Sequence, residues 1–271
     1  MMKGRNLVVL IGIPSWLFLI WKGDLYYSIF ILICMALALG EFYSLMEEKG
    51  AKPLRWMGMA ATVFIADYYY VQPAITPHEM LGGIILIIIL TCIWELFSKK
   101  ENSGQNIAAT LAGIMFVTVL LGTAIDIRQF DLLMSTQLTL VLVLSVWACD
   151  TAAFIFGTHY GKKKIFPSVS PKKSWVGSVA GLIAAMAVFL GFYYQDWLGS
   201  YFSLKDAIVF GIITGVFGQI GDLAESLLKR DAGVKDTGTL LAGHGGVLDR
   251  FDSLIFAMPL AYLYVHFIMH Y

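Results

Sequence analysis

The feature that most constrains this chain is a succession of apolar segments, each roughly 15 to 20 residues long, joined by short polar connections. About 20 apolar residues in a helix cross the hydrocarbon core of a bilayer. Backbone polar groups find no water there, so a helix, which pairs them internally, is the expected structure. We therefore predict an all-α polytopic integral membrane protein with about nine transmembrane helices. The nine segments are 7–21, 25–43, 56–71, 80–97, 107–125, 138–156, 175–194, 208–228 and 253–268.

The composition supports this class. Of 271 residues, 58% are hydrophobic and 14% charged, whereas a soluble domain has about 25% charged residues. The net charge is zero, so no nucleic-acid partner is expected, and the lipid bilayer is the expected surrounding. Cys34, Cys92 and Cys149 lie in separate apolar segments and suggest neither disulfides nor a metal site.

The basic residues indicate an orientation. If all nine segments span and the N-terminus is cytoplasmic, 16 Lys and Arg residues fall inside and three fall outside, namely Lys22, Arg128 and Lys205. Cytoplasmic loops carry such an excess of basic residues, so we predict a cytoplasmic N-terminus and an external C-terminus. We divide the chain into residues 1–135, with about five transmembrane helices, and residues 136–271, with about four helices and the cytoplasmic active-site loops, within a single membrane-embedded unit.

Several carboxylates lie at membrane depth. Glu41 and Glu95 near cytoplasmic helix ends, and Asp67 near an outer end, are interpreted as interfacial anchors or helix-end partners. Asp150 lies deep in the sixth segment. A carboxylate there must be neutralised by a proton, a cation or a basic partner, which makes it a candidate functional residue.

The segment from Ser226 to Ser253 concentrates charges and glycines between two apolar segments. Helical spacing places one group of polar side chains on a single face just before and within it. A glycine-rich stretch follows at 243–246, and two aspartates one turn apart open the last helix. Hard oxygen ligands beside fixed cations suit Mg²⁺ and phosphate-containing substrates. The single-face group is Asp222, Glu225, Ser226 and Lys229, and the two aspartates are Asp249 and Asp252.

The residues alone leave an alternative function open. Intramembrane acids next to glycine-rich helices are also found in ion-coupled membrane transporters. That alternative accounts poorly for the clustered cations and the glycine loop at one leaflet, and no two-fold repeat is visible. No zinc-type spacing and no P-loop pattern is present.

The segment Ser226 to Ser253 closely resembles the signature of the phosphatidate cytidylyltransferases, S…LKR…G-x-KD-x-G…GHGG-x-x-DR-x-D. A second similar block runs D-T-A-A-F-x-x-G from Asp150 to Gly157, followed by S-P-K-K-S-W from Ser170 to Trp175. The chain departs from the usual pattern at Ala242, where the family has Pro, and at Val176, where Glu or Gln is common.

The resemblance implies an enzyme that condenses CTP with phosphatidic acid to form CDP-diacylglycerol and pyrophosphate in phospholipid biosynthesis. It implies a multi-pass protein of the bacterial inner (plasma) membrane, with its active site facing the cytoplasm. It also implies a requirement for Mg²⁺ and is compatible with a second cation such as K⁺. Small residues on the helices permit a homodimer. The paired DG-x-x-AR pattern of another lipid-headgroup family, the CDP-alcohol phosphotransferases, is absent.

Within that reaction we assign roles to the charged residues. Asp222 and Asp249 are the leading metal ligands, and Asp252 and Asp150 are further ligands or carboxylates behind them. Ser226 is expected to bind phosphate or metal through its hydroxyl. His244 is expected either to hydrogen-bond phosphate or protonate the departing pyrophosphate, or to structure the loop. The cations expected to neutralise the triphosphate and pyrophosphate are Lys229, Arg230, Lys235 and Arg250. The remaining substrate-binding candidates are Lys172, Lys173, Gly245 and Gly246.

Overall fold

The structure is a computed structural model that describes residues 2–71, 77–98, 101–131, 134–200, 202–240 and 245–269, with the side chains of residues 2–10 excepted. Within these ranges the chain is helical and contains no strand beyond an isolated bridge between Lys164 and Ser174. His244 and Gly243, part of the predicted glycine loop, lie outside the described residues.

The first half of the chain contains the helices α1 to α6, and α5 continues into α6 through the π-helical segment η1. Their bounds are α1 Met2–Lys22, α2 Asp24–Glu48, α3 Arg55–Val71, α4 Pro77–Ser98, α5 Ser103–Gly113, η1 Ile114–Val119 and α6 Leu120–Ile127.

The second half contains α7 to α12, and α9 likewise continues into α10 through the π-helical segment η2. Local π-helical turns within α-helices frequently occur at functional sites. The bounds are α7 Ser135–Tyr160, α8 Trp175–Tyr194, α9 Leu204–Ile212, η2 Ile213–Phe217, α10 Gly218–Asp231, α11 Leu248–Phe251 and α12 Leu254–Phe267.

Six helical stretches among the described residues are long and apolar enough to cross a membrane. They are Asp24–Glu48, Pro77–Ser98, Ser103–Ile127, Ser135–Tyr160, Trp175–Tyr194 and Leu204–Asp231. The predicted all-α membrane class is therefore confirmed. The other three predicted spans correspond to helical segments as well, but α3 has 17 residues and α12 has 14, and α1 begins in the part without described side chains.

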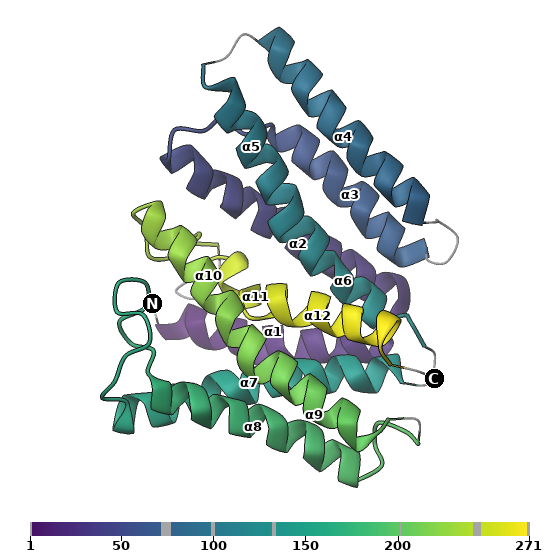
Figure 1. Cartoon of the computed structure of the whole chain (residues 1–271), viewed down its shortest axis with the longest axis vertical. Coiled ribbons are helices and arrows are strands. Elements are labelled where there is room, and N and C mark those ends of the chain that lie inside the picture. The colour runs from purple at the N-terminus through teal and green to yellow at the C-terminus, as the bar shows by residue number, and fades with distance from the viewer. Residues whose placement is uncertain are drawn as a thin grey trace.

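The elements that carry the charged segment lie between two groups of helices. Figure 1 shows α3, α4 and α5 at one end of the molecule and the closely packed pair α7 and α8 at the other, with α10, α11 and α12 between them. Helix α11 contacts α2, and α12 contacts α6 and α10. The charged segment therefore has neighbours from both halves of the chain.

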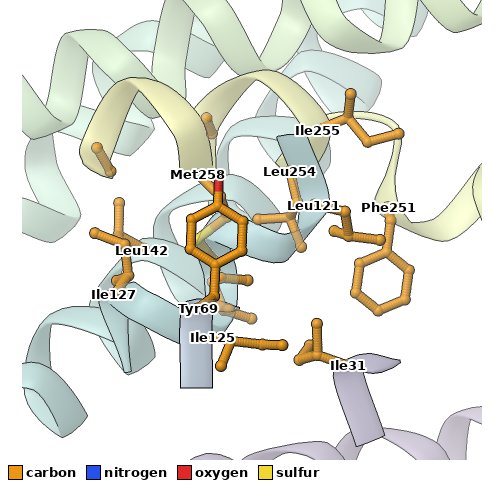
Figure 2. Packing of buried hydrophobic residues seen from close by; sticks show 14 of the residues in the cluster. Ile31, Tyr69, Leu121, Ile125, Ile127, Leu142, Phe251, Leu254, Ile255 and Met258 are labelled. Carbon is orange, nitrogen blue, oxygen red and sulfur yellow. The ribbon is translucent and has the colours of Figure 1, made fainter. Parts of the chain in front are cut away.

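The hydrophobic core surrounds α12 and also draws on both halves. Figure 2 shows Leu254 and Met258 of this region packed against Tyr69 of α3 and Leu121 of α6. Each of these side chains is buried. Burial of this apolar surface fixes α12, and with it the short helix α11, against the N-terminal helices.

Two glycines of α10 let its neighbours approach closely. A Cβ at Gly221 would lie 2.5 Å from the carbonyl oxygen of Asp252, and a Cβ at Gly218 would touch Ser253. The upstream glycines Gly211 and Gly215 instead face α8. This close approach brings the start of α12 directly against α10.

Candidate functional site

Three carboxylates meet where α10 passes the α11–α12 junction. One oxygen each from Asp222, Glu225 and Asp252 lies within 4.8 Å of the other two. Asp222 and Glu225 stand one turn apart on α10, and the absence of a side chain at Gly221 admits the backbone of Asp252 beside them. Helical spacing and close packing together thus assemble an acidic cluster from two distant parts of the sequence.

This cluster fits a divalent cation. The Glu225 side chain is fully buried, and its Oε1 has no hydrogen-bond partner among the described residues. Burial and the neighbouring carboxylates, Asp222 first, raise the pKa of Asp252 above its usual range. Clustered buried carboxylates are costly unless a cation compensates them. Carboxylate oxygens are the hard ligands that Mg²⁺ prefers.

A lysine from a different block of the sequence reaches the cluster. Lys173 Nζ lies 2.7 Å from Asp222 Oδ2, and both side chains are partly exposed. Lys173 directly precedes Ser174, whose side chain caps the N-terminus of α8 by accepting a hydrogen bond from the backbone N–H of Gly177. The cap holds the end of the loop 161–174 at the site.

Lys229 joins the cluster to a fourth carboxylate. Its Nζ lies 2.5 Å from Glu225 Oε2 and donates a hydrogen bond of 2.7 Å to Asp249 Oδ1. The predicted single face of α10 is confirmed, because Ser226 Oγ also donates to Asp222 Oδ1 at 3.3 Å. Lys229 is buried, so its two ionic contacts are poorly screened by solvent.

Asp249 accepts hydrogen bonds from the loop around it. The N–H groups of Thr237 and Gly246 donate to Asp249 Oδ2 at 2.9 and 2.7 Å, and Thr237 Oγ1 lies 3.0 Å from the same oxygen. Burial opposes ionisation of Asp249, but the hydrogen bonds from Lys229 and from these amides outweigh it and hold the pKa of Asp249 below its usual range. Asp249 therefore stays a carboxylate and organises the loop.

Glu41 of α2 lies on the other side of the same loop. Its Oε1 accepts from the N–H of Val247 and its Oε2 from the N–H of Leu248, both at 2.8 Å, while Thr237 Oγ1 lies 2.9 Å from Oε2. Of the two roles expected for Glu41, interfacial anchor or helix-end partner, the contacts support the second, because its carboxylate accepts from amides at the start of α11. Glu95 is also buried, with Oε1 accepting from Asn106 Nδ2 at 2.6 Å, so it is a helix-packing partner.

The other predicted residues occupy the margin of the cluster. Asp150 on α7 and Arg250 on α11 are both exposed. The two side chains are close enough to interact electrostatically. Asp150 also lies near Asp222 and Lys173, outside the group of three carboxylates.

Three further predicted cations, Arg230, Lys172 and Lys235, are also exposed. Arg230 donates from Nε to the carbonyl of Val169 at 3.2 Å and from Nη1 to that of Val234 at 2.9 Å, so it ties two loops together. For Lys172 and Lys235 the described part of the chain shows no contact with the carboxylates.

Gly245 and Gly246, which were predicted to bind substrate, lie against carboxylates of the protein itself. Gly245 has φ +78°, and a Cβ there would lie 2.5 Å from Asp249 Oδ2. A Cβ at Gly246 would overlap Glu41 and Thr237. A side chain at either position would therefore displace a carboxylate of the site.

Three contributors to the site were not predicted from the sequence. Glu225 was placed on the correct face but not assigned as a ligand, although its i, i+3 spacing from Asp222 was visible. Glu41 carried only the weak signal of an acid inside an apolar segment. Thr237 carried no signal, because its role depends on long-range folding.

Comparisons with known proteins agree with the motifs. A model of the cytidylyltransferase family matches residues 3–268. Curated proteins called phosphatidate cytidylyltransferase are similar throughout. The protein from Staphylococcus saprophyticus is 33% identical, covering 96% of this chain and 97% of its own length. That from Staphylococcus aureus is 32% identical with the same coverage. That from Synechocystis sp. is 29% identical, covering 96% and 95%.

Proposed function

This chain belongs to the cytidylyltransferase family, and we propose that it condenses CTP with phosphatidic acid to give CDP-diacylglycerol and pyrophosphate. The observation that carries the proposal is the convergence of Asp222, Glu225 and Asp252 beside Lys173 and Lys229. The relatives named phosphatidate cytidylyltransferase cover nearly the whole chain and support the same activity. The ion-coupled transporter alternative gains no support from them.

The chemistry makes modest demands on the protein. A phosphate monoester has its second pKa near 6, so the headgroup of phosphatidic acid is already a nucleophilic anion at neutral pH. It attacks the α-phosphorus of CTP, a new P–O bond forms, and the bond to pyrophosphate breaks. Since two anions must meet, catalysis depends on positioning and charge neutralisation, and no general base is required.

We assign the metal site to the carboxylate cluster. Asp222, Glu225 and Asp252 would hold Mg²⁺, which as a Lewis acid offsets negative charge on phosphate oxygens. Asp249 remains a proposed ligand through Oδ1, the oxygen that accepts a hydrogen bond from Lys229. Asp150 remains a proposed carboxylate beside the metal ligands. The same carboxylates would also suit a second cation such as K⁺.

The basic side chains have separable tasks. Lys173 and Lys229, already at the cluster, would neutralise phosphate oxygens as substrates enter. Lys172, Lys235 and Arg250 are exposed and would contact the nucleotide or lipid headgroup. Arg230 would act by holding the loops around Val169 and Val234. Ser226 would contact phosphate or metal through its hydroxyl, and His244 keeps its predicted phosphate contact.

We further propose the nine-span topology in the plasma membrane, with the charged cluster facing the cytoplasm, where CTP is. The excess of basic residues in the predicted inside loops supports this orientation. Labelling of single cysteines placed at Lys162 and Lys205 in intact cells and in inverted vesicles tests it. Opposite accessibility is expected, and labelling from the same side would contradict it. Cross-linking in membranes tests the permitted homodimer.

The activity is tested with purified protein in detergent. Labelled CTP and phosphatidic acid should give CDP-diacylglycerol and one pyrophosphate per lipid when Mg²⁺ is present, and none after chelation. Diacylglycerol, which lacks the phosphate nucleophile, serves as the matched control and should give no product. If phosphatidic acid is also inert across several acyl chains and divalent ions, the proposal fails.

A further inference from the structure

The catalytic loop is held by a residue of the N-terminal half. Glu41 lies on α2, about 200 residues before its partners, and its carboxylate accepts from the N–H groups of Val247 and Leu248. Among the described residues, Glu41 is the α2 residue whose side chain accepts hydrogen bonds from the amides at the start of α11. These N–H groups have no partner within a helix, so Glu41 satisfies donors that would otherwise be free.

Glu41 and Asp249 accept hydrogen bonds from the same two segments of the loop, Thr237 and residues 246–248. Thr237 Oγ1 lies 2.9 Å from Glu41 Oε2 and 3.0 Å from Asp249 Oδ2. Its single hydroxyl proton serves one carboxylate at a time, while its N–H donates to Asp249. The amides of residues 246–248 are likewise shared between the two carboxylates. The N–H of Gly246 donates to Asp249, and those of the next two residues donate to Glu41.

The spacing of the loop also depends on Glu41. A Cβ at Gly246 would overlap its Oε2, and a Cβ at Gly238 would lie 2.9 Å from its Oε1. Two glycines of the charged segment therefore line the Glu41 carboxylate. Lys49, the residue directly after α2, pairs through Nζ with Asp231 Oδ1 at 3.1 Å, at the exposed end of α10. Helix α2 and the residue that follows it thus contact both α10 and α11.

We infer that Glu41 is a positioning residue for the cytidylyltransferase site: its carboxylate sets the place of Thr237 and of the amides of Val247 and Leu248, and thereby of Asp249. Its hydrogen bonds within the described residues go to Thr237, Val247 and Leu248, and we assign it no contact with a reacting atom. The inference rests on the proposed function, and it makes the N-terminal half part of the site machinery.

The test is Glu41→Gln in the full-length protein, with Glu47→Gln as the matched control. Glutamine has nearly the same size but offers one acceptor oxygen, and its NH₂ would face a backbone N–H. Glu47 lies on the same helix, is exposed and pairs with Arg55. Losing a hydrogen bond to a charged group corresponds to a change of about tenfold or more. We expect that increase in the KM for CTP and in the Mg²⁺ concentration for half-maximal activity, with an unchanged KM for phosphatidic acid.

Two further measurements separate positioning from folding. Hydrogen exchange of the peptide covering 245–250 should accelerate in Glu41→Gln and stay normal in Glu47→Gln. Thr237→Val combined with Glu41→Gln should be less than additive, because both changes act on one contact. A lower kcat with unaltered KM and Mg²⁺ requirement, or unaltered exchange, overturns the inference. An inactive wild-type protein would instead refute the proposed function, and the exchange measurement would still decide the role of Glu41.

Discussion

Lys173 and Asp222 form an ion pair of 2.7 Å between two sequence blocks separated by about 50 residues. Lys173 ends the loop before α8, and Asp222 belongs to the carboxylate cluster on α10. The lysine thus lies beside an oxygen that the proposed metal site would use. Metal binding at the proposed site would therefore compete with this pair.

Lys173→Gln tests that competition. We expect a weaker substrate affinity, with KM rising about tenfold for a lost charged contact, while the Mg²⁺ requirement stays equal or falls because Asp222 is freed. The measurement is a two-dimensional titration of CTP and Mg²⁺. Lys162→Gln, an exposed change in the same loop, should leave both values unchanged. A rise in the Mg²⁺ requirement of Lys173→Gln would contradict the competition.

Asp222→Asn should remove activity almost completely. Mutation of a residue that hydrogen-bonds to a metal ligand commonly lowers metal affinity or activity 10- to 100-fold. Loss of a ligand itself should therefore lower activity by more than about a hundredfold. Product formation at saturating CTP measures it. Asp231→Asn is the control on the same helix, because Asp231 pairs with Lys49 in an exposed position. Equal effects of the two substitutions would remove Asp222 from the metal site.

Asp252→Asn and Asp249→Asn should differ in Mg²⁺ binding. Asp252 belongs to the group of three carboxylates, whereas both oxygens of Asp249 accept hydrogen bonds from the protein. Both variants should lose turnover while remaining folded. The thermal stabilisation by Mg²⁺ should vanish in Asp252→Asn and persist in part in Asp249→Asn. The reverse order would make Asp249 the principal ligand.

Lys229→Met should destabilise the protein in a metal-dependent way. The substitution leaves Glu225 and Asp249 as buried carboxylates without their shared cation. Breaking such a buried pair costs about 3 kcal/mol or more. We expect a lower thermal midpoint in chelator and partial recovery with Mg²⁺. The exposed pair partner Lys49, changed to Met, should shift the midpoint little. No recovery of Lys229→Met with Mg²⁺ would argue against a cation at this cluster.

Arg230→Lys tests whether this residue acts through the loops. A lysine keeps the charge but loses the planar fork that donates to Val169 and Val234. Activity should fall, and limited proteolysis after Lys162, Lys163 or Lys164 should become faster. Unaltered proteolysis with lost activity would indicate a direct contact with substrate instead.

The sequence alone determined the membrane class and the helical content, and it predicted most residues of the proposed site. Apolar length predicts spanning helices because unpaired backbone groups are costly in lipid. Helical spacing placed Asp222, Glu225, Ser226 and Lys229 on one face, because that relation is local and follows from 3.6 residues per turn. The motifs likewise identified the family, since they preserve residue types at fixed spacing.

Only the tertiary structure decided which carboxylates share a site and which organise the loop. Asp249 and Asp252 are one turn apart in sequence, yet Asp252 meets α10 through the space at Gly221 while Asp249 faces Lys229 and Thr237. Glu41 joins the loop because core packing around α12 fixes α11 against α2. Such relations depend on burial and on partners about 200 residues apart, and no local spacing contains them.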